Sequence, residues 1–182
     1  MRQKRSSLRE KPPPCHTTAN SCKALADDRV ASALESLSVI ADQPRANFHS
    51  TTPQPLRAAR SCYDHIAGSL GVALHDRLTA LHWLISERRA GEACDLTAAG
   101  SRALKAHGID VDAARSQRRR FAFACIDWSE RRPHLGGALA AALMQAGLDK
   151  RWIVRDDDSR ALTVTALGRR EFKARFNLEL DA

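Results

Sequence analysis

Two short segments each combine a cysteine, an aspartate and a histidine, the residue types that bind soft metal ions or other effectors. Their members are Cys62, Asp64 and His65 in the first segment and Cys125, Asp127 and His134 in the second. A thiolate together with an imidazole suits zinc or another late transition metal. These six residues are therefore candidate ligands of a metal ion or a small effector.

The spacing of these residues argues against one shared metal site. Cys62 and His65 are three positions apart, whereas Cys125 and His134 are nine positions apart. In the alternative interpretation, the cysteines are small buried hydrophobic residues, the histidines bond to helix ends and the two aspartates cap the local backbone. We favour this structural interpretation and expect no cofactor, with zinc as the metal to consider if a site exists.

A run of basic residues could bind the phosphates of DNA. Its members are Arg115, Arg118, Arg119 and Arg120. Such a run is more often the solvated face of a long helix, and Glu130 and the acidic turn 156–158 provide partners within the chain. We expect the solvated face and keep phosphate binding as the alternative.

Catalysis has little support in this sequence. No nucleophile lies in a known motif, no glycine-rich loop could cradle a phosphate, and no pair of carboxylates is marked out. We therefore expect a protein that is not an enzyme.

Length and composition exclude several other classes of protein. The chain has 182 residues, of which 43% are hydrophobic and 27% charged, and this fits one or two small globular domains. The longest nearly apolar run, residues 135–148, is too short to span a bilayer, and no apolar signal segment follows the N-terminus. Five widely spaced cysteines without a CxxC motif do not predict disulfides. We expect a reduced, cytoplasmic protein with no membrane partner.

The basic excess of the chain lies mainly in an N-terminal tail. The formal net charge is +8, from 29 basic against 21 acidic residues, and residues 1–22 contribute five basic residues against one acidic residue. These 22 residues have few large apolar side chains, and we expect them to be disordered. The remaining chain is only weakly basic, which does not fit a strongly basic DNA-binding body.

The segment after the tail predicts a helix and then a linker. In residues 24–43, Val30, Leu34 and Leu37 recur at helical spacing behind an aspartate N-cap. This apolar stripe has no partner in the neighbouring sequence, so we expect the helix to mediate dimerisation. Residues 44–57 contain three prolines among polar residues and predict a linker.

The compact part of the chain contains an internal repeat. With a shift of 69 positions, residues 65–70 align with residues 134–139, and Trp83 aligns with Trp152. After the loss of one residue, LTAAG aligns with VTALG. Two aligned tryptophans, each followed by an apolar pair, favour a true repeat over a chance match.

Each copy predicts helical segments, a short strand at the tryptophan, a polar turn, a second strand and a threonine N-cap. The order helix, helix, two-stranded ribbon, helix is that of a winged helix-turn-helix unit. We therefore predict a mainly α fold with short β-ribbons (α+β), built from winged-helix-like units at 58–109 and 110–182. A long helix from Val111 to about Arg131 would bridge them, and Pro133 would begin the next helix.

The helices at the position of a recognition helix carry few groups that could read DNA bases. Residues 72–78 are half apolar and include an acidic residue, and residues 140–146 are almost entirely Ala, Leu and Met. Base reading needs side chains such as Arg, Asn or Gln. We expect these faces to pack rather than to read, with His75 and His82 on a partly exposed helix face.

Four longer motifs carry a family resemblance. They are AARSCYDHIAG at 58–68, LTAAG at 96–100, CIDWSERRPHL at 125–135 and VTALGRR at 164–170. With these motifs, the chain from residue 24 to its end resembles the C-terminal two-thirds of a long-form bacterial ArsR-type helix-turn-helix transcriptional regulator. The resemblance implies a homodimer that acts on duplex DNA.

In such regulators a winged-helix DNA-binding domain precedes the matching region. The first 22 residues here do not resemble that domain. The resemblance therefore implies a regulator whose DNA-reading domain is missing, through truncation or a late start, and whose own binding to DNA is weak and non-specific. The alternative is a dimerising or effector-binding or metal-binding module without sequence-specific contact to DNA.

Overall fold

The described part of the chain begins with a short helix and a β-hairpin. The computed structural model describes residues 33, 50–85 and 91–180. Helix α2 (Gln54–Ala58) leads into the antiparallel strands β1 (Arg60–Cys62) and β2 (His65–Ala67), followed by helix α3 (Gly68–Ala80). The hairpin of β3 (Leu84–Ile85) and β4 (Asp95–Leu96) then precedes helices α4 (Ala98–Ala106) and α5 (Val111–Ser116).

The same order of elements follows a second time. Strands β5 (Phe123–Ile126) and β6 (Pro133–Gly136) form a hairpin before helix α6 (Ala138–Asp149), and strands β7 (Ile153–Arg155) and β8 (Leu162–Val164) form another before helix α7 (Ala166–Phe176). We call residues 60–106 the first half and residues 123–176 the second half. The mixed α+β fold predicted from the sequence is confirmed.

Trp83 and Trp152 lie at the same place in the two halves. Each follows the helix behind the first hairpin, and its carbonyl oxygen accepts a hydrogen bond at 3.0 Å from the amide of the threonine that starts the last helix. The two threonines, Thr97 and Thr165, each accept a hydrogen bond from an amide three residues later, so both predicted N-caps are confirmed. The predicted strand at each tryptophan and the predicted second strand before each threonine are also present, as β3, β4, β7 and β8.

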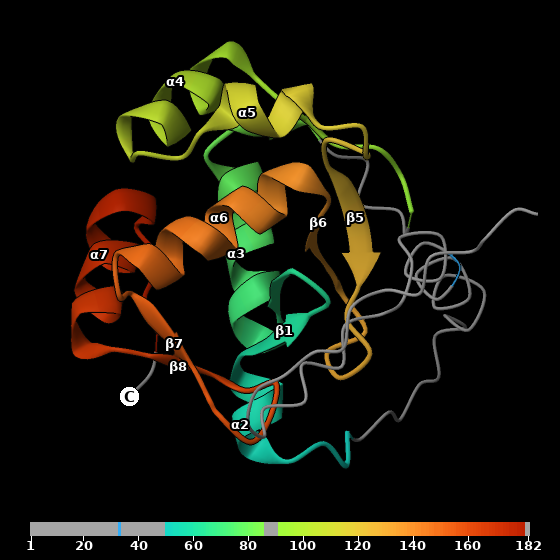
Figure 1. Cartoon of the computed structure of the whole chain (residues 1–182), viewed down its shortest axis with the longest axis vertical. Helices are drawn as coiled ribbons and strands as arrows, with labels where there is room; N and C mark the ends of the chain where they lie inside the picture. Colours follow the sequence, from blue (N-terminus) through green and yellow to red (C-terminus); the bar gives the residue numbers. More distant parts are fainter. Residues whose placement is uncertain (1–32, 34–49, 86–90, 181–182) are drawn as a thin grey trace, which may run out of the picture.

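Buried side chains from both halves form one hydrophobic core. In the view of Figure 1, helix α6 lies over helix α3 near the middle of the fold. Strand β6 packs against α3, and strand β2 packs against α6, so each hairpin contacts the helix of the other half. The predicted boundary near residue 109 therefore does not separate two independent cores.

The predicted bridging helix from 111 to 131 is wrong. Helix α5 begins behind Asp110, whose side chain accepts a hydrogen bond from the Ala113 amide, but it ends at Ser116. Gln117 already has extended backbone angles, and β5 starts six residues later. The segment Phe123–Ile126 contains aromatic and β-branched residues that favour strands, and its backbone finds a partner in β6.

The predicted winged-helix order is also wrong at the start of each copy. A β-hairpin stands where the first helix of the unit was expected, and Pro133 begins strand β6 rather than a helix. The turn of the first hairpin, Tyr63-Asp64, contains no Gly, although Tyr63 has a φ of 56°. Sequence rules look for Gly or Asn at such a position, and this hairpin therefore gives a weak signal.

The N-terminal predictions lie largely outside the described residues. The tail 1–22, the helix 24–43 (apart from Ala33) and residues 44–49 are not part of the description. The end of the predicted linker 44–57 is corrected, because α2 already begins at Gln54 behind Pro53. Within the described ranges, no helix has both the length and the apolar character needed to cross a membrane.

Two glycines make the sharp change from hairpin to helix. Gly68 and Gly137 stand directly before or at the start of α3 and α6, with φ angles of +78° and +94°. These values lie in the region that side chains other than Gly rarely adopt. A Cβ added to Gly137 would also lie 2.8 Å from the Phe121 carbonyl oxygen.

The substitution Gly137→Ala should therefore lower the free energy of unfolding by about 1–3 kcal/mol through backbone strain. Urea unfolding of the full chain measures this change. The control is Gly147→Ala in the same helix, where the new methyl group meets only the movable end of the Ile153 side chain at 3.2 Å. Equal losses for the two variants would contradict the assigned role of Gly137.

Candidate functional site

Two hairpins bring four of the six candidate ligands together. Cys62 lies directly opposite His65 in the first hairpin, and Cys125 lies directly opposite His134 in the second. Strands β2 and β6 are neighbours, so the two pairs meet. One ligand atom from each residue lies within 4.8 Å of the corresponding atoms of the other three. We call these four residues the Cys2His2 cluster.

Different loop lengths explain the unequal spacing of the two pairs. The first hairpin turns over two residues, whereas the second runs through a longer loop from Asp127 to Arg132. In both hairpins the cysteine and histidine are cross-strand partners, whose side chains lie next to each other on one face. Spacings of three and nine therefore produce the same local geometry, and the sequence argument against a shared site is wrong.

The two histidine rings face each other in the interior of the protein. His65 and His134 are both fully buried, and their Nε2 atoms lie 3.1 Å apart. Each Nδ1 instead faces a carboxylate, at 3.3 Å from Asp64 for His65 and at 3.6 Å from Asp127 for His134. The rings thus turn Nε2 into the cluster, and neither serves a helix end as the sequence interpretation expected.

Asp127 connects the second hairpin to the first half of the chain. Its fully buried carboxylate accepts hydrogen bonds from the Arg60 guanidinium at 2.8 Å and from the Gly68 amide at 2.6 Å. The amides of Ser129 and Glu130 and the Ser129 hydroxyl donate to the same carboxylate. Because Gly68 is the first residue of α3, Asp127 caps a helix of the other half. Asp127 therefore caps its own turn, as expected from the sequence, and it also caps a helix that is distant in the sequence.

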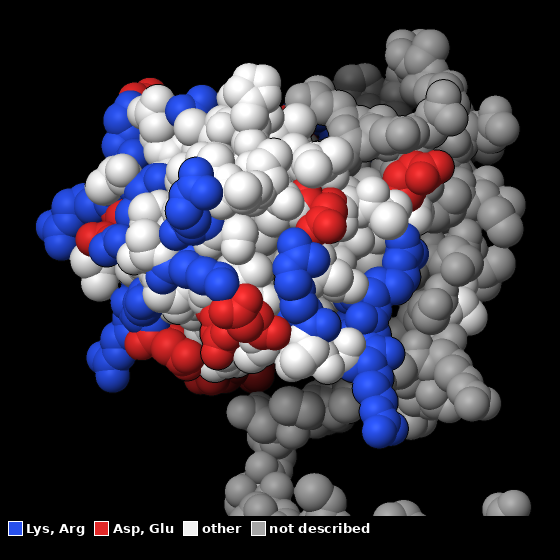
Figure 2. All heavy atoms as spheres, turned by 90° about the horizontal axis from the view of Figure 1, so that it is seen from above, with Lys and Arg blue, Asp and Glu red and all other residues white. Residues whose placement is uncertain are grey.

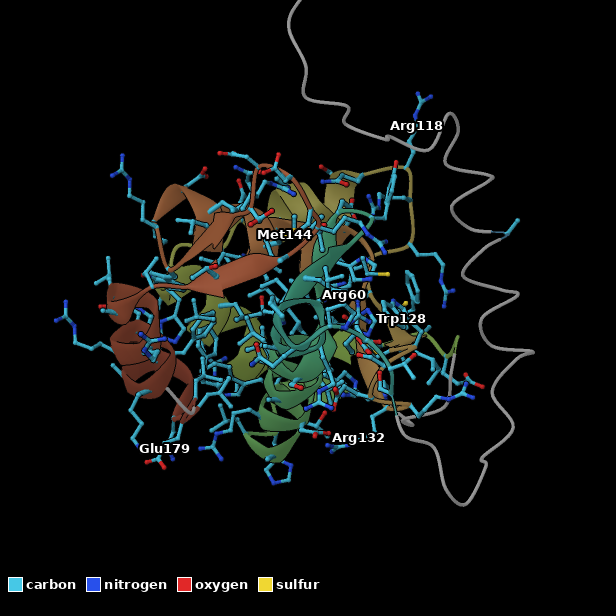
Figure 3. The ribbon with its side chains drawn as sticks, turned by 90° about the horizontal axis from the view of Figure 1, so that it is seen from below. Arg60, Arg118, Trp128, Arg132, Met144 and Glu179 are labelled. Carbon is cyan, nitrogen blue, oxygen red and sulfur yellow. The ribbon has the colours of Figure 1, made fainter. Side chains whose placement is uncertain are left out.

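Arg60 completes this buried pair. Its guanidinium donates to the Leu56 carbonyl and the Ser129 hydroxyl, each at 2.9 Å, and stacks 4.1 Å from the centre of the Trp128 ring. Figure 3 shows Arg60 and Trp128 side by side. Burial opposes ionisation of Asp127, but the hydrogen bonds from Arg60 and Gly68 outweigh it and lower its pKa to about 2.

Asp64 stands in a similar relation to His65. Arg119, from the loop before β5, forms an ion pair with the Asp64 carboxylate. Although burial of Asp64 works in the opposite direction, its hydrogen bonds with His65 and Arg119 lower the pKa of the carboxyl. Each histidine therefore has a carboxylate beside Nδ1, and an arginine holds each carboxylate in place.

The protonation of the Cys2His2 cluster favours a thiolate. A hydrogen bond with Cys125 lowers the pKa of the Cys62 thiol, against the effect of burial and with help from both histidines. Burial alone would lower the pKa of His65, but hydrogen bonds with Asp64 and Cys62 raise it to about 9. Burial and the neighbouring charge of His65 lower the pKa of His134. A thiolate is the form of cysteine that binds metals.

The arginine run lies at the end of α5 and in the loop after it, not on the face of a long helix. Arg115 pairs with Asp95 at 2.5 Å, and Arg120 donates to the Gly91 carbonyl at 2.7 Å. For these two arginines, the partners differ from those predicted for the run, which were Glu130 and the turn 156–158. Arg118 extends away from the fold (Figure 3), and acidic side chains lie among the basic ones on the face shown in Figure 2.

The helices at the recognition position are buried. Val72, Leu74 and Leu78 of α3 belong to the core, as do residues of α6. His75 is also fully buried, which corrects its expected place on a partly exposed face, whereas His82 is exposed. Both helices therefore direct apolar side chains into the core shared by the two halves.

Arg60 and Ser129 are site residues that the sequence reasoning missed. Asp127-Trp128-Ser129 is an Asp-x-Ser turn, in which the Ser129 amide donates to Asp127 at 2.9 Å, and this turn chemistry can be recognised from sequence. The pairing of Asp127 with Arg60, which lies 67 positions away in the sequence, has no local sequence signal of this kind.

Comparison with known proteins provides a relative from Bacillus subtilis (strain 168), named "uncharacterized HTH-type transcriptional regulator YdfF". It is 34% identical to this chain over 158 residues, which make up 86% of this chain and 69% of the relative. No model of a known protein family matches the chain, and no solved structure matches it either.

The substitution Asp127→Asn should lower the free energy of unfolding by about 3–5 kcal/mol, because it leaves the buried Arg60 charge without its counter-charge. Urea unfolding measures the loss. The control is Asp112→Asn, which removes the exposed ion pair with Lys105 and should cost less than about 1 kcal/mol. Similar losses in both variants would contradict the role given to Asp127.

Proposed function

Because this chain belongs to the family of helix-turn-helix (HTH) transcriptional regulators, we propose that it is a homodimeric, cytoplasmic regulator of the ArsR type whose described part receives a signal rather than reads DNA bases. The observation that carries this proposal is the burial of α3 and α6. A helix whose side chains fill the core cannot enter the major groove with the same face.

Charge on the described surface also favours this division of roles. Arg115 and Arg119 are already engaged by Asp95 and Asp64. Arg118 is the member of the run that extends from the fold, and it is suited to a phosphate but not to a base edge. Contacts of this kind add affinity without sequence preference.

The two halves would be copies of one signal-receiving unit. The recurrence of hairpin, helix, hairpin and helix supports this proposal, as do the equivalent hydrogen bonds of Trp83 and Trp152. In this proposal the first hairpin of each half, β1–β2 and β5–β6, forms the receiving site, because these two hairpins carry the Cys2His2 cluster. The units at 58–109 and 110–182 would then act together through their shared core.

A second candidate function is a dimerising effector or metal module that makes no sequence-specific contact with DNA. The Cys2His2 cluster favours this candidate, because it lies wholly within the described residues. The two candidates differ in whether DNA is a partner at all, and a DNA titration separates them.

This chain should bind duplex DNA weakly, with an affinity that falls steeply as salt rises and does not depend on sequence. A fluorescence titration compares its own promoter region with a scrambled duplex at two salt concentrations. Arg118→Ala should reduce the salt slope by about 0.9, the value for one phosphate contact. The matched control is Lys173→Ala, which loses the same charge but from an ion pair with Glu179.

Removing residues 1–22 should weaken the binding further, because they carry +4 of the +8 net charge. Tight, salt-tolerant preference for the promoter would overturn the signal-receiving role of α3 and α6. Complete absence of DNA binding at low salt would favour the second candidate function.

The apolar stripe of residues 24–43 should hold the homodimer together. Replacing both Leu34 and Leu37 with Glu should convert the dimer to a monomer, since a helix pair cannot bury four charges at its centre. Sedimentation velocity measures the change. The control is Ser32→Glu, which the same helical spacing places opposite the stripe. A monomeric parent chain, or a double variant that remains dimeric, would remove this element from the proposal.

A further inference from the structure

We propose that Cys62, His65, Cys125 and His134 form a four-ligand site for a Zn²⁺-class transition metal ion, shared by the two halves of the chain. This inference deepens the proposed function, because it names the class of ligand that the proposed receiving site would bind. It is carried by the cross-strand placement of two Cys–His pairs and by the meeting of their hairpins.

The size of the cluster fits one ion. Zinc binds sulfur at about 2.3 Å and nitrogen at about 2.0–2.1 Å in a tetrahedron, so its ligand atoms lie about 3.3–3.8 Å from each other. The ligand atoms of the cluster all lie within 4.8 Å, and the two Nε2 atoms are 3.1 Å apart. Small side-chain shifts would therefore complete the tetrahedron.

The histidines are oriented as metal ligands. A proton on each Nδ1, directed at Asp64 or Asp127, leaves the lone pairs of both Nε2 atoms directed at one buried point. Without an ion, a proton shared by the two Nε2 atoms, which are in hydrogen-bond contact at 3.1 Å, holds this arrangement, and a cation at that point would take its place. A carboxylate behind a ligating histidine is the usual support of a zinc site.

The chemistry of the donors selects the class of metal. Two sulfurs and two imidazole nitrogens favour Zn²⁺ and other late transition ions over Mg²⁺ or Ca²⁺, which prefer oxygen. Four protein ligands fill the tetrahedron, so the site is closed and does not hold the reactive water of a hydrolytic zinc enzyme. Cys62 is the half-buried member of the cluster.

Binding would connect parts of the chain that are far apart in sequence. Each half supplies one thiolate and one imidazole, and the neighbouring Asp127 caps α3. An ion would therefore fix both hairpins and the start of a core helix. A role for the ion as the signal rests on the proposed function, whereas its binding does not.

The full-length chain, reduced and freed of metal, should bind one Co²⁺ ion with the intense visible bands of a tetrahedral site and the near-ultraviolet charge transfer of thiolate ligands. Zn²⁺ should displace it. Cys62→Ser and Cys125→Ser should each weaken Co²⁺ binding more than about 100-fold. Replacing a residue that only supports a metal ligand usually costs about 10–100-fold, so the loss of a ligand should exceed that range. Asp64→Asn should weaken Co²⁺ binding about 10–100-fold.

Control variants test whether the Co²⁺ spectrum comes from the Cys2His2 cluster. Cys94→Ser removes another buried cysteine and should leave the spectrum unchanged, as should the double substitution Cys15→Ser and Cys22→Ser in the N-terminal segment. Because a variant can lose binding by misfolding, Zn²⁺ should also raise the melting temperature of the parent and of Cys94→Ser, but not of a folded Cys62→Ser variant.

An octahedral spectrum without thiolate bands, or the same loss in Cys94→Ser as in Cys62→Ser, would overturn the metal site. The DNA titration is a separate outcome. Metal binding without any DNA binding would contradict the regulator proposal and leave the metal site in place. Salt-dependent DNA binding without metal binding would contradict the metal site and leave the regulator proposal in place.

Discussion

The buried ion pair of Arg60 and Asp127 is the interaction on which the rest of the structure depends. Both side chains are fully excluded from solvent, so each loses a hydration shell that the protein must replace. Asp127 replaces it with donors from Arg60, Gly68, Ser129 and Glu130, and Arg60 adds Leu56 and the Trp128 ring. These contacts form only when the hairpins of the two halves meet, so the pair fixes their relative position.

The Cys2His2 cluster follows from this fixed position. Once the hairpins are neighbours, each places a cysteine opposite a histidine at the same level of its ladder. Asp127, held by Arg60, faces one histidine, and Asp64, paired with Arg119, faces the other. The charged contacts therefore orient the ligands, and the ligands in turn lie against the start of α3. A change in the geometry of the cluster would therefore shift the start of α3 and the core side chains packed on it. A signal-receiving module requires such a connection.

Local sequence signals predicted the parts of this fold that depend on neighbours in the chain. The Thr97 and Thr165 caps and the strands beside the tryptophans rest on short patterns, and they are present. The hairpin at Tyr63-Asp64 and the strand Phe123–Ile126 were missed, because their pairing partners, rather than turn residues, determine them. The six candidate ligands were found by residue type, but their assembly depends on contacts across the two halves. Spacing along the chain could not show it.

X-ray absorption at the zinc edge of the Zn²⁺-loaded full chain is the most direct test of this account. The site should show two sulfur neighbours at about 2.3 Å and two nitrogen neighbours at about 2.0–2.1 Å, and one sulfur should be lost in Cys125→Ser. A shell of oxygen and nitrogen alone, or a sulfur count unchanged by that substitution, would contradict a metal site shared by the two hairpins.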